Sequence, residues 1–69
     1  MKNGVHVNEY GSKIWYRNDR YHREDGPAVE YASGTKRWYL NDKRYIFEEW
    51  LNELDASEED KLILKLTWA

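Results

Sequence analysis

Two nine-residue segments decide the fold of this chain: GSKIWYRND at residues 11–19 and GTKRWYLND at residues 34–42. They lie 23 residues apart, six of their nine positions are identical, and a seventh exchanges Ser for Thr. A repeat with a period of about 20 to 50 residues indicates stacked copies of one supersecondary unit. The repeat therefore predicts an architecture, although it does not by itself indicate a function.

Composition predicts a small domain with an aromatic core. The chain has 69 residues and no cysteine, so no disulfide can stabilise it. It has four Trp, six Tyr and one Phe, and each such side chain can bury about 150–250 Å². The two histidines show no metal-ligand spacing, so we expect neither a metal nor a cofactor.

Short antiparallel strands are expected in and around the repeat. Between residues 13 and 17, Trp15 falls on one face of a strand and Tyr16 on the other. Asn and Asp tolerate positive φ, so each Asn-Asp pair is expected to form a two-residue hairpin turn. Gly26-Pro27 must interrupt any strand. We therefore expect a meander of about six strands, near residues 5–10, 13–17, 20–22, 28–31, 35–40 and 43–45.

The hydrophobic period then changes from two to about 3.6, which predicts helices. Phe47, Trp50, Leu51 and Leu54 form a single apolar stripe. A second helix is expected after Ser57, whose hydroxyl suits an N-cap. Apolar residues cover more than half of this second helix, so it needs burial on two sides or a partner, and a homo-oligomer stays open.

The sequence thus predicts an α+β fold in one domain, residues 1–69. β-Hairpin repeats at residues 1–45 precede a helical cap at residues 46–69, and the two helices form a hairpin packed on one sheet face. Alternation puts Trp15 and Trp38 on one face and Tyr16 and Tyr39 on the other. It does not decide which face the helices cover.

The repeat resembles the MORN-like hairpin repeats of small proteins from bacteria, phages and large viruses. The resemblance covers about residues 10–45, and its most specific part is the joint His-Arg-Glu-Asp-Gly-Pro-Ala at residues 22–28. The chain departs from the pattern in having Asn-Asp where Asn-Gly is usual. Its second unit also closes in Arg44-Tyr45 rather than another His-Arg, so the array ends there and the helices cap it.

The resemblance implies binding or scaffolding and provides no catalytic residue. Within the joint, His22 and Asp25 could act as base and orienting group, but no nucleophile has a place beside them. The structural interpretation, a turn stabilised by Asp-Gly-Pro, is therefore preferred, and we expect no enzyme. Because small phage proteins commonly act on a host factor, the resemblance implies a protein that inhibits or redirects one, such as a component of a defence system.

Basic and aromatic side chains around the repeat are the candidate binding residues. An aromatic sheet surface rimmed by Arg and Lys suits a protein partner, and nucleic acid or a small anionic ligand is the alternative. Residues 1–45 carry a net charge of +3 and residues 46–69 one of −5, so the acidic helices are a rival surface. The candidate set is Lys13, Trp15, Arg17, Arg20, Lys36, Trp38, Lys43 and Arg44.

Two features of the sequence indicate which class of partner the chain binds and where in the cell it is located. The isoelectric point of about 5.6 lies far from the basic range of nucleic-acid-binding domains, so nucleic acid is the weaker partner. No signal-peptide run and no apolar stretch of membrane-spanning length occurs in the sequence. We therefore expect no membrane and a cytoplasmic protein, in the host cytoplasm if a phage encodes it.

Overall fold

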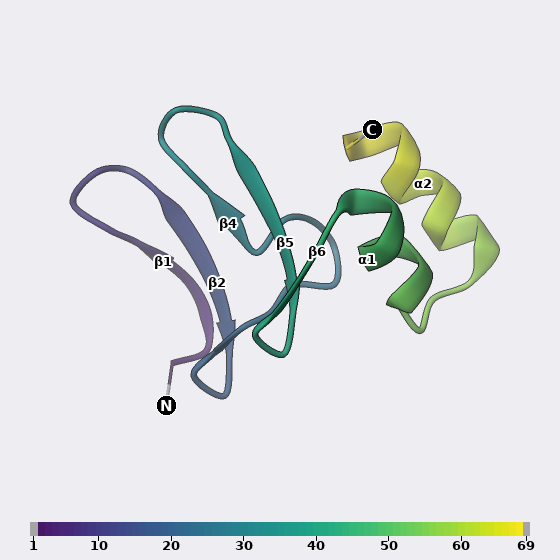
Figure 1. The fold of residues 1–69 in the computed structure, drawn as a ribbon, viewed down its shortest axis with the longest axis horizontal. Coiled ribbons are helices and arrows are strands. Elements are labelled where there is room, and N and C mark those ends of the chain that lie inside the picture. The colour runs from purple at the N-terminus through teal and green to yellow at the C-terminus, as the bar shows by residue number, and fades with distance from the viewer. Residues whose placement is uncertain (1, 69) are drawn as a thin grey trace.

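The computed structural model describes residues 2–68, and it confirms the predicted α+β fold (Figure 1). A six-stranded antiparallel sheet precedes two C-terminal helices, and the helices gather at the β6 end of the sheet. The elements are β1 (Gly4–Val7), β2 (Lys13–Arg17), β3 (Arg20–Tyr21), β4 (Val29–Glu30), β5 (Lys36–Leu40), β6 (Lys43–Tyr45), α1 (Phe47–Glu53) and α2 (Glu58–Trp68).

The repeat in the sequence is a repeat in strand register. Tyr16 pairs with Tyr21 in the first unit, and Tyr39 pairs with Arg44 in the second. The same shift of 23 residues converts the β1–β2 partners into the β4–β5 partners. Figure 1 shows the two hairpins, β1–β2 and β4–β5, side by side. Each unit is therefore one hairpin with a short return strand.

The strand order differs in one detail from a simple meander. β3 contains only two residues, pairs with the end of β2, and lies off the main path β1-β2-β4-β5-β6. β4 pairs with the other end of β2, where Ile14 lies opposite Val29. After β3 the chain crosses to β5, where the backbone N–H of Arg23 donates to the carbonyl oxygen of Tyr39 (3.3 Å). Gly26-Pro27 then separates β3 from β4, because a strand cannot continue through it. β2 thus pairs with β1 along one edge and with β3 and β4 along the other.

Both Asn-Asp turns adopt the left-handed backbone that the sequence predicts. The φ angles are 51° at Asn18, 64° at Asp19, 50° at Asn41 and 70° at Asp42. Positive φ at both central residues matches the right-handed twist of the flanking strands, and Asn and Asp tolerate it better than most residues. These residues are therefore turn formers.

Lys2 and Asn3 contact the first hairpin as Tyr21 and His22 contact the second. In the second unit, the first residue of the turn donates its backbone N–H to Nδ1 of His22 (3.0 Å). In the first unit, the backbone N–H of Asn18 donates to Oδ1 of Asn3 (3.0 Å) instead. Lys2 places its ammonium 5.0 Å from the ring centre of Tyr16, a site that an aromatic ring fills in the second unit. Lys2 and Asn3 thus cover the side of the first hairpin that corresponds to the side of the second hairpin facing Tyr21 and His22.

The core lies between the second unit and the helices. Trp38 is buried, and its ring centre lies 4.6 Å from that of Trp50 and 4.9 Å from that of Phe47. Leu51 and Leu54 complete the buried cluster. The predicted stripe of α1 is therefore its buried face, and the helices pack on the tryptophan side of the sheet.

The joint anchors both helices through indole hydrogen bonds. Trp50 donates its Nε1–H to the carbonyl oxygen of Arg23 (3.0 Å), and Trp68 donates to that of Asp25 (3.0 Å). Ser57 caps α2 as predicted, because its Oγ accepts the backbone N–H of Asp60 (3.1 Å). The joint is thus the structural link between the repeats and their helical cap.

Within residues 2–68, no helix has the length and apolar character needed to cross a bilayer.

Candidate functional site

An aromatic ladder crosses the sheet on the side opposite Trp38. The ring centres of His6 and Tyr16 lie 5.2 Å apart, those of Tyr16 and Tyr21 5.4 Å, and those of Tyr21 and Tyr39 5.2 Å. Adjacent strands supply the rings, because cross-strand partners share a face. We call this surface the tyrosine face, defined as His6, Tyr16, Tyr21, Arg37, Tyr39 and Arg44.

Positive charge accompanies the ladder. Arg37 lies opposite Val29, and Arg44 lies opposite Tyr39, so both belong to the same face as the rings. Among the strand residues within the described range 2–68, alternation places no Asp or Glu on this face. The tyrosine face is therefore aromatic and basic.

The phenol of Tyr21 is electrostatically distinct. Partial burial raises the pKa of Tyr21 above its ordinary value of 10.0, and the neighbouring phenols of Tyr16, Tyr39 and Tyr31, with the carboxylate of Asp42, raise it further. Both causes disfavour the phenolate, since a buried anion loses hydration and meets other developing negative charges. The phenol of Tyr21 therefore keeps its proton to a higher pH than its ordinary pKa would allow.

The raised pKa of Tyr21 predicts a loss of stability in alkali. The folded state holds the pKa of Tyr21 above its unfolded value. Protonated Tyr21 therefore contributes fully to the free energy of unfolding below about pH 10, and this contribution is lost as the pH rises through the folded pKa. Urea titrations across the alkaline range should show a falling midpoint for the wild type and a flatter profile for Tyr21→Phe. Equal slopes for the two proteins would contradict this prediction.

Seven of the eight residues in the candidate set lie on the other face, with Trp38, or at its ends. Trp38 itself is buried beneath the helices and is not available to a partner. Trp15 is half-buried, and the guanidinium of Arg23 covers its ring at 3.9 Å. That guanidinium also lies 5.4 Å from the ring of Trp68, so it is held between two indoles. Both repeat tryptophans therefore serve the fold, and of the set only Arg44 belongs to the tyrosine face.

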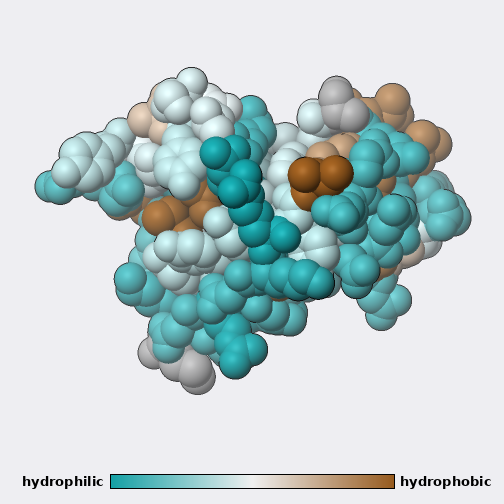
Figure 2. Space-filling model, in the orientation of Figure 1, coloured by the Kyte–Doolittle hydropathy of each residue, from teal (hydrophilic) through white to brown (hydrophobic). Residues whose placement is uncertain are grey.

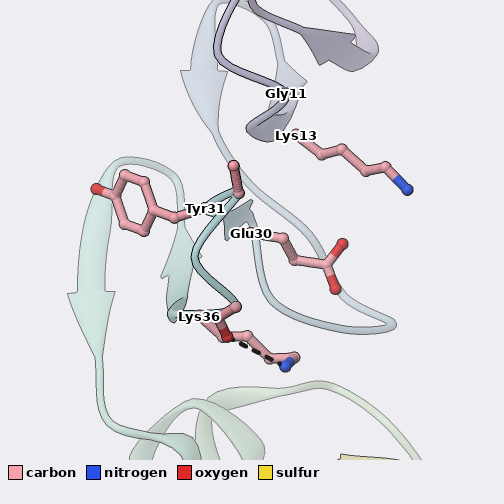
Figure 3. A pocket seen from close by; sticks show the side chains of 7 residues that line it. Gly11, Lys13, Glu30, Tyr31 and Lys36 are labelled. Atoms are coloured by element: carbon pink, nitrogen blue, oxygen red, sulfur yellow. Dashed lines mark hydrogen bonds between the residues drawn. The ribbon is translucent and has the colours of Figure 1, made fainter.

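Lys13 and Lys36 occur together beside a hollow of about 280 Å³ between the two hairpin loops (Figure 3). Glu30 lies between them, since it is the cross-strand partner of both. Lys36 also donates from Nζ to the carbonyl oxygen of Gly34 (3.4 Å). The intervening carboxylate offsets the positive charge, so this hollow is poorly suited to a small anion.

Arg17 belongs to a hydrogen-bonded cluster at the joint. It donates to the carboxylate of Glu24 (3.2 Å) and to Oδ1 of Asn41 (3.2 Å). His22 is 8% exposed, and its Nδ1 accepts the backbone N–H of Asn41. Its proton therefore lies on Nε2, which donates to Glu24 (3.1 Å). Both ring nitrogens of His22 are thus engaged in structure, which agrees with the structural interpretation of the joint.

Arg20 and Lys43 are exposed beside the two turns on the tryptophan side. No cluster of metal-ligating side chains occurs among residues 2–68.

The sequence leaves open which ring of each Trp-Tyr pair is exposed, and the candidate set drawn from it does not include Tyr21, His6 and Arg37. The signal for Tyr21 was present, because a two-residue turn at Asn18-Asp19 must place it opposite Tyr16.

Comparison with known proteins adds no relative. No family model matches the chain, and no curated protein and no solved structure matches it either. The similarity to MORN-like repeats therefore stays a prediction from the residues that carry it.

Proposed function

We propose that this chain is a non-enzymatic protein-binding module that presents its tyrosine face to an acidic surface of a protein partner. One observation carries the proposal: the helices pack on the tryptophan side, which leaves a four-ring aromatic ladder with Arg37 and Arg44 on the other side. The MORN-like resemblance suggests a host protein as the first partner to test.

Composition of the face favours a protein partner. Tyr and Arg are enriched at protein interfaces, where a ring supplies contact area and a guanidinium supplies directed hydrogen bonds. The ladder also restrains the rings before binding, so less side-chain entropy is lost on association. The two arginines and the nearby ammonium of Lys2 would complement carboxylates on the partner.

Ring geometry makes nucleic acid the weaker candidate. Base stacking needs an accessible ring face, but adjacent rings of the ladder meet at interplanar angles of 83°, 60° and 74°. Each ring therefore turns its edge toward a neighbouring face. The net charge of −2 also provides little of the long-range attraction that phosphates require.

Charge reversal on the two faces tests the proposal. Tagged protein would capture partners from host lysate, with identification by mass spectrometry and affinity measured on the purified partner. We expect Arg37→Glu with Arg44→Glu to weaken binding at least about tenfold, because two attractive contacts become repulsive.

The matched control is Lys13→Glu with Lys36→Glu, which makes the same charge change on the other face. Binding that survives reversal of Arg37 and Arg44 but fails after reversal of Lys13 and Lys36 would assign the partner to the tryptophan side instead. Circular dichroism should show both variants folded, since all four side chains lie at the surface or its margin.

A further inference from the structure

Helix α2 exposes apolar side chains on its outer side. None of its eleven residues, all of which the structure describes, is buried. Leu62 is 57% exposed, Ile63 54% and Leu66 79%. Leu66 lies three residues after Ile63 and four after Leu62, a spacing that places the three side chains on one stripe, and Figure 2 shows hydrophobic surface along the outer side of this helix. The contacts with the core come instead from Leu64 and Trp68, on the opposite side of the helix.

A hollow adjoins this stripe. It has a volume of about 280 Å³ and lies between α2 and the joint, where Ala56, Ile63 and Leu64 supply apolar surface. Pockets for drug-sized ligands are typically about 300–1,000 Å³, so this open hollow suits a side chain better than a small molecule. The stripe and the hollow share Ile63 and form one continuous surface.

The rim of this surface is acidic. Glu24, Asp25 and Asp60 line the hollow. Glu24 pairs with Arg17 (3.2 Å) and Asp25 with Arg23 (2.7 Å), so the negative charge offered to a partner comes mainly from Asp60 and the first turn of α2. Glu58 and Glu59 begin the helix. The surrounding region, residues 46–69, has a net charge of −5. A segment that fits must therefore combine apolar side chains with positive charge.

We propose that α2 and the adjoining hollow dock a basic amphipathic helix of a protein partner. An apolar side chain of that helix fills the hollow, its neighbours pack along Leu62 and Leu66, and its Lys or Arg residues face the acidic rim. Helix-in-groove recognition uses this combination of spaced apolar anchors and flanking charge. The surface is independent of the tyrosine face, so the chain could hold two partners of opposite charge.

A second copy of this chain is the competing occupant of the stripe. Pairing two copies through α2 would bring together two regions that each carry −5, and like charges in an interface are repulsive. Charge complementarity therefore favours a basic segment over self-association.

A synthetic peptide pair tests the docking proposal. One peptide is an amphipathic helix of Leu and Lys, about three heptads long, and the other replaces every Lys by Glu. Titration followed by amide chemical shifts should show the Leu/Lys peptide binding with its largest shifts at Ala56 and along α2. The Leu/Glu peptide should cause none, and affinity for the Leu/Lys peptide should fall as salt rises.

Variants that keep the net charge distinguish docking through apolar contacts from nonspecific electrostatic attraction. Ile63→Ser with Leu66→Ser keeps the net charge and should weaken the Leu/Lys peptide at least about tenfold through loss of apolar anchors. The control is Val5→Ser with Val7→Ser, since these residues are 52% and 62% exposed on β1, and it should bind as the wild type does.

Three results would overturn the proposal. They are unchanged affinity after Ile63→Ser with Leu66→Ser, equal binding of the Leu/Glu peptide, and concentration-dependent dimerisation that the same two substitutions abolish. The last result, measured by sedimentation without peptide, would assign the stripe to a second copy.

Discussion

Replacing Trp50 by Ala should destabilise the protein by about 3–5 kcal/mol, the cost of removing a large aromatic side chain from a core. Trp50 is fully buried, packs against the tilted ring of Trp38, stacks on Phe47, and donates its Nε1–H to the carbonyl of Arg23. A domain of 69 residues has a total stability of only about 3–10 kcal/mol. The variant should therefore be partly or wholly unfolded at room temperature.

Urea titration followed by far-ultraviolet circular dichroism measures this loss. Trp50→Phe separates the two contributions, because it keeps an aromatic ring and removes the hydrogen bond to Arg23, at a smaller expected cost of about 1–2 kcal/mol. Tyr10→Ala is the surface control, since Tyr10 is 76% exposed, and it should change stability by less than about 0.5 kcal/mol. A Trp50→Ala protein as stable as this control would contradict the proposed core.

Local chemistry made most of the fold predictable. The Asn-Asp turns, the Gly26-Pro27 break and the N-cap at Ser57 are decided by neighbouring residues, and all three were confirmed. The 23-residue repeat predicted two equivalent hairpins, and the strand register repeats with the same shift. Strong local preferences that agree with the final fold are typical of such short repeating units.

Which sheet face the helices cover could not be predicted in the same way. Alternation makes Trp38 and Tyr39 equally eligible for the core, because both are large and amphipathic. The choice depends on contacts between residues far apart in sequence, notably the hydrogen bonds from Trp50 and Trp68 to the joint. For this reason the sequence placed the candidate site around Trp15 and Trp38, whereas the face that the helices leave uncovered carries the tyrosines.

The contacts of Lys2 and Asn3 with the first hairpin could not be predicted from the sequence either. Neither side chain resembles the Tyr21-His22 pair whose positions they fill. The acceptor of Asn3 and the cation of Lys2 replace the imidazole and the ring, while the backbone of Lys2 makes the same hydrogen bonds to the turn as that of Tyr21. Equivalent positions in a repeat can thus be occupied by different chemistry where an array ends. Only the strand register makes the correspondence visible.

Gly26 leads to the second prediction of a large effect, because it lies where α2 meets the joint. A Cβ added at Gly26 would lie 2.7 Å from Cζ2 of Trp68 and 2.8 Å from Cζ of Arg23. Real Cβ atoms essentially never approach so closely, so the indole must move and its hydrogen bond to the carbonyl of Asp25 must weaken. Gly26→Ala should cost about 1–3 kcal/mol and should remove hydrogen-exchange protection from α2 before the sheet.

A double-mutant cycle with Trp68→Leu shows whether the indole is the obstacle. If it is, the cost of Gly26→Ala should fall by about 1 kcal/mol or more in the Trp68→Leu background, because the two positions are in contact. Gly34→Ala is the matched control: its φ of +96° makes any side chain strained, but nothing lies within 4 Å of the added Cβ. Its cost should be the same in both backgrounds. An unchanged cost for Gly26→Ala would instead place the clash at Arg23, and the docking of α2 would not depend on this glycine.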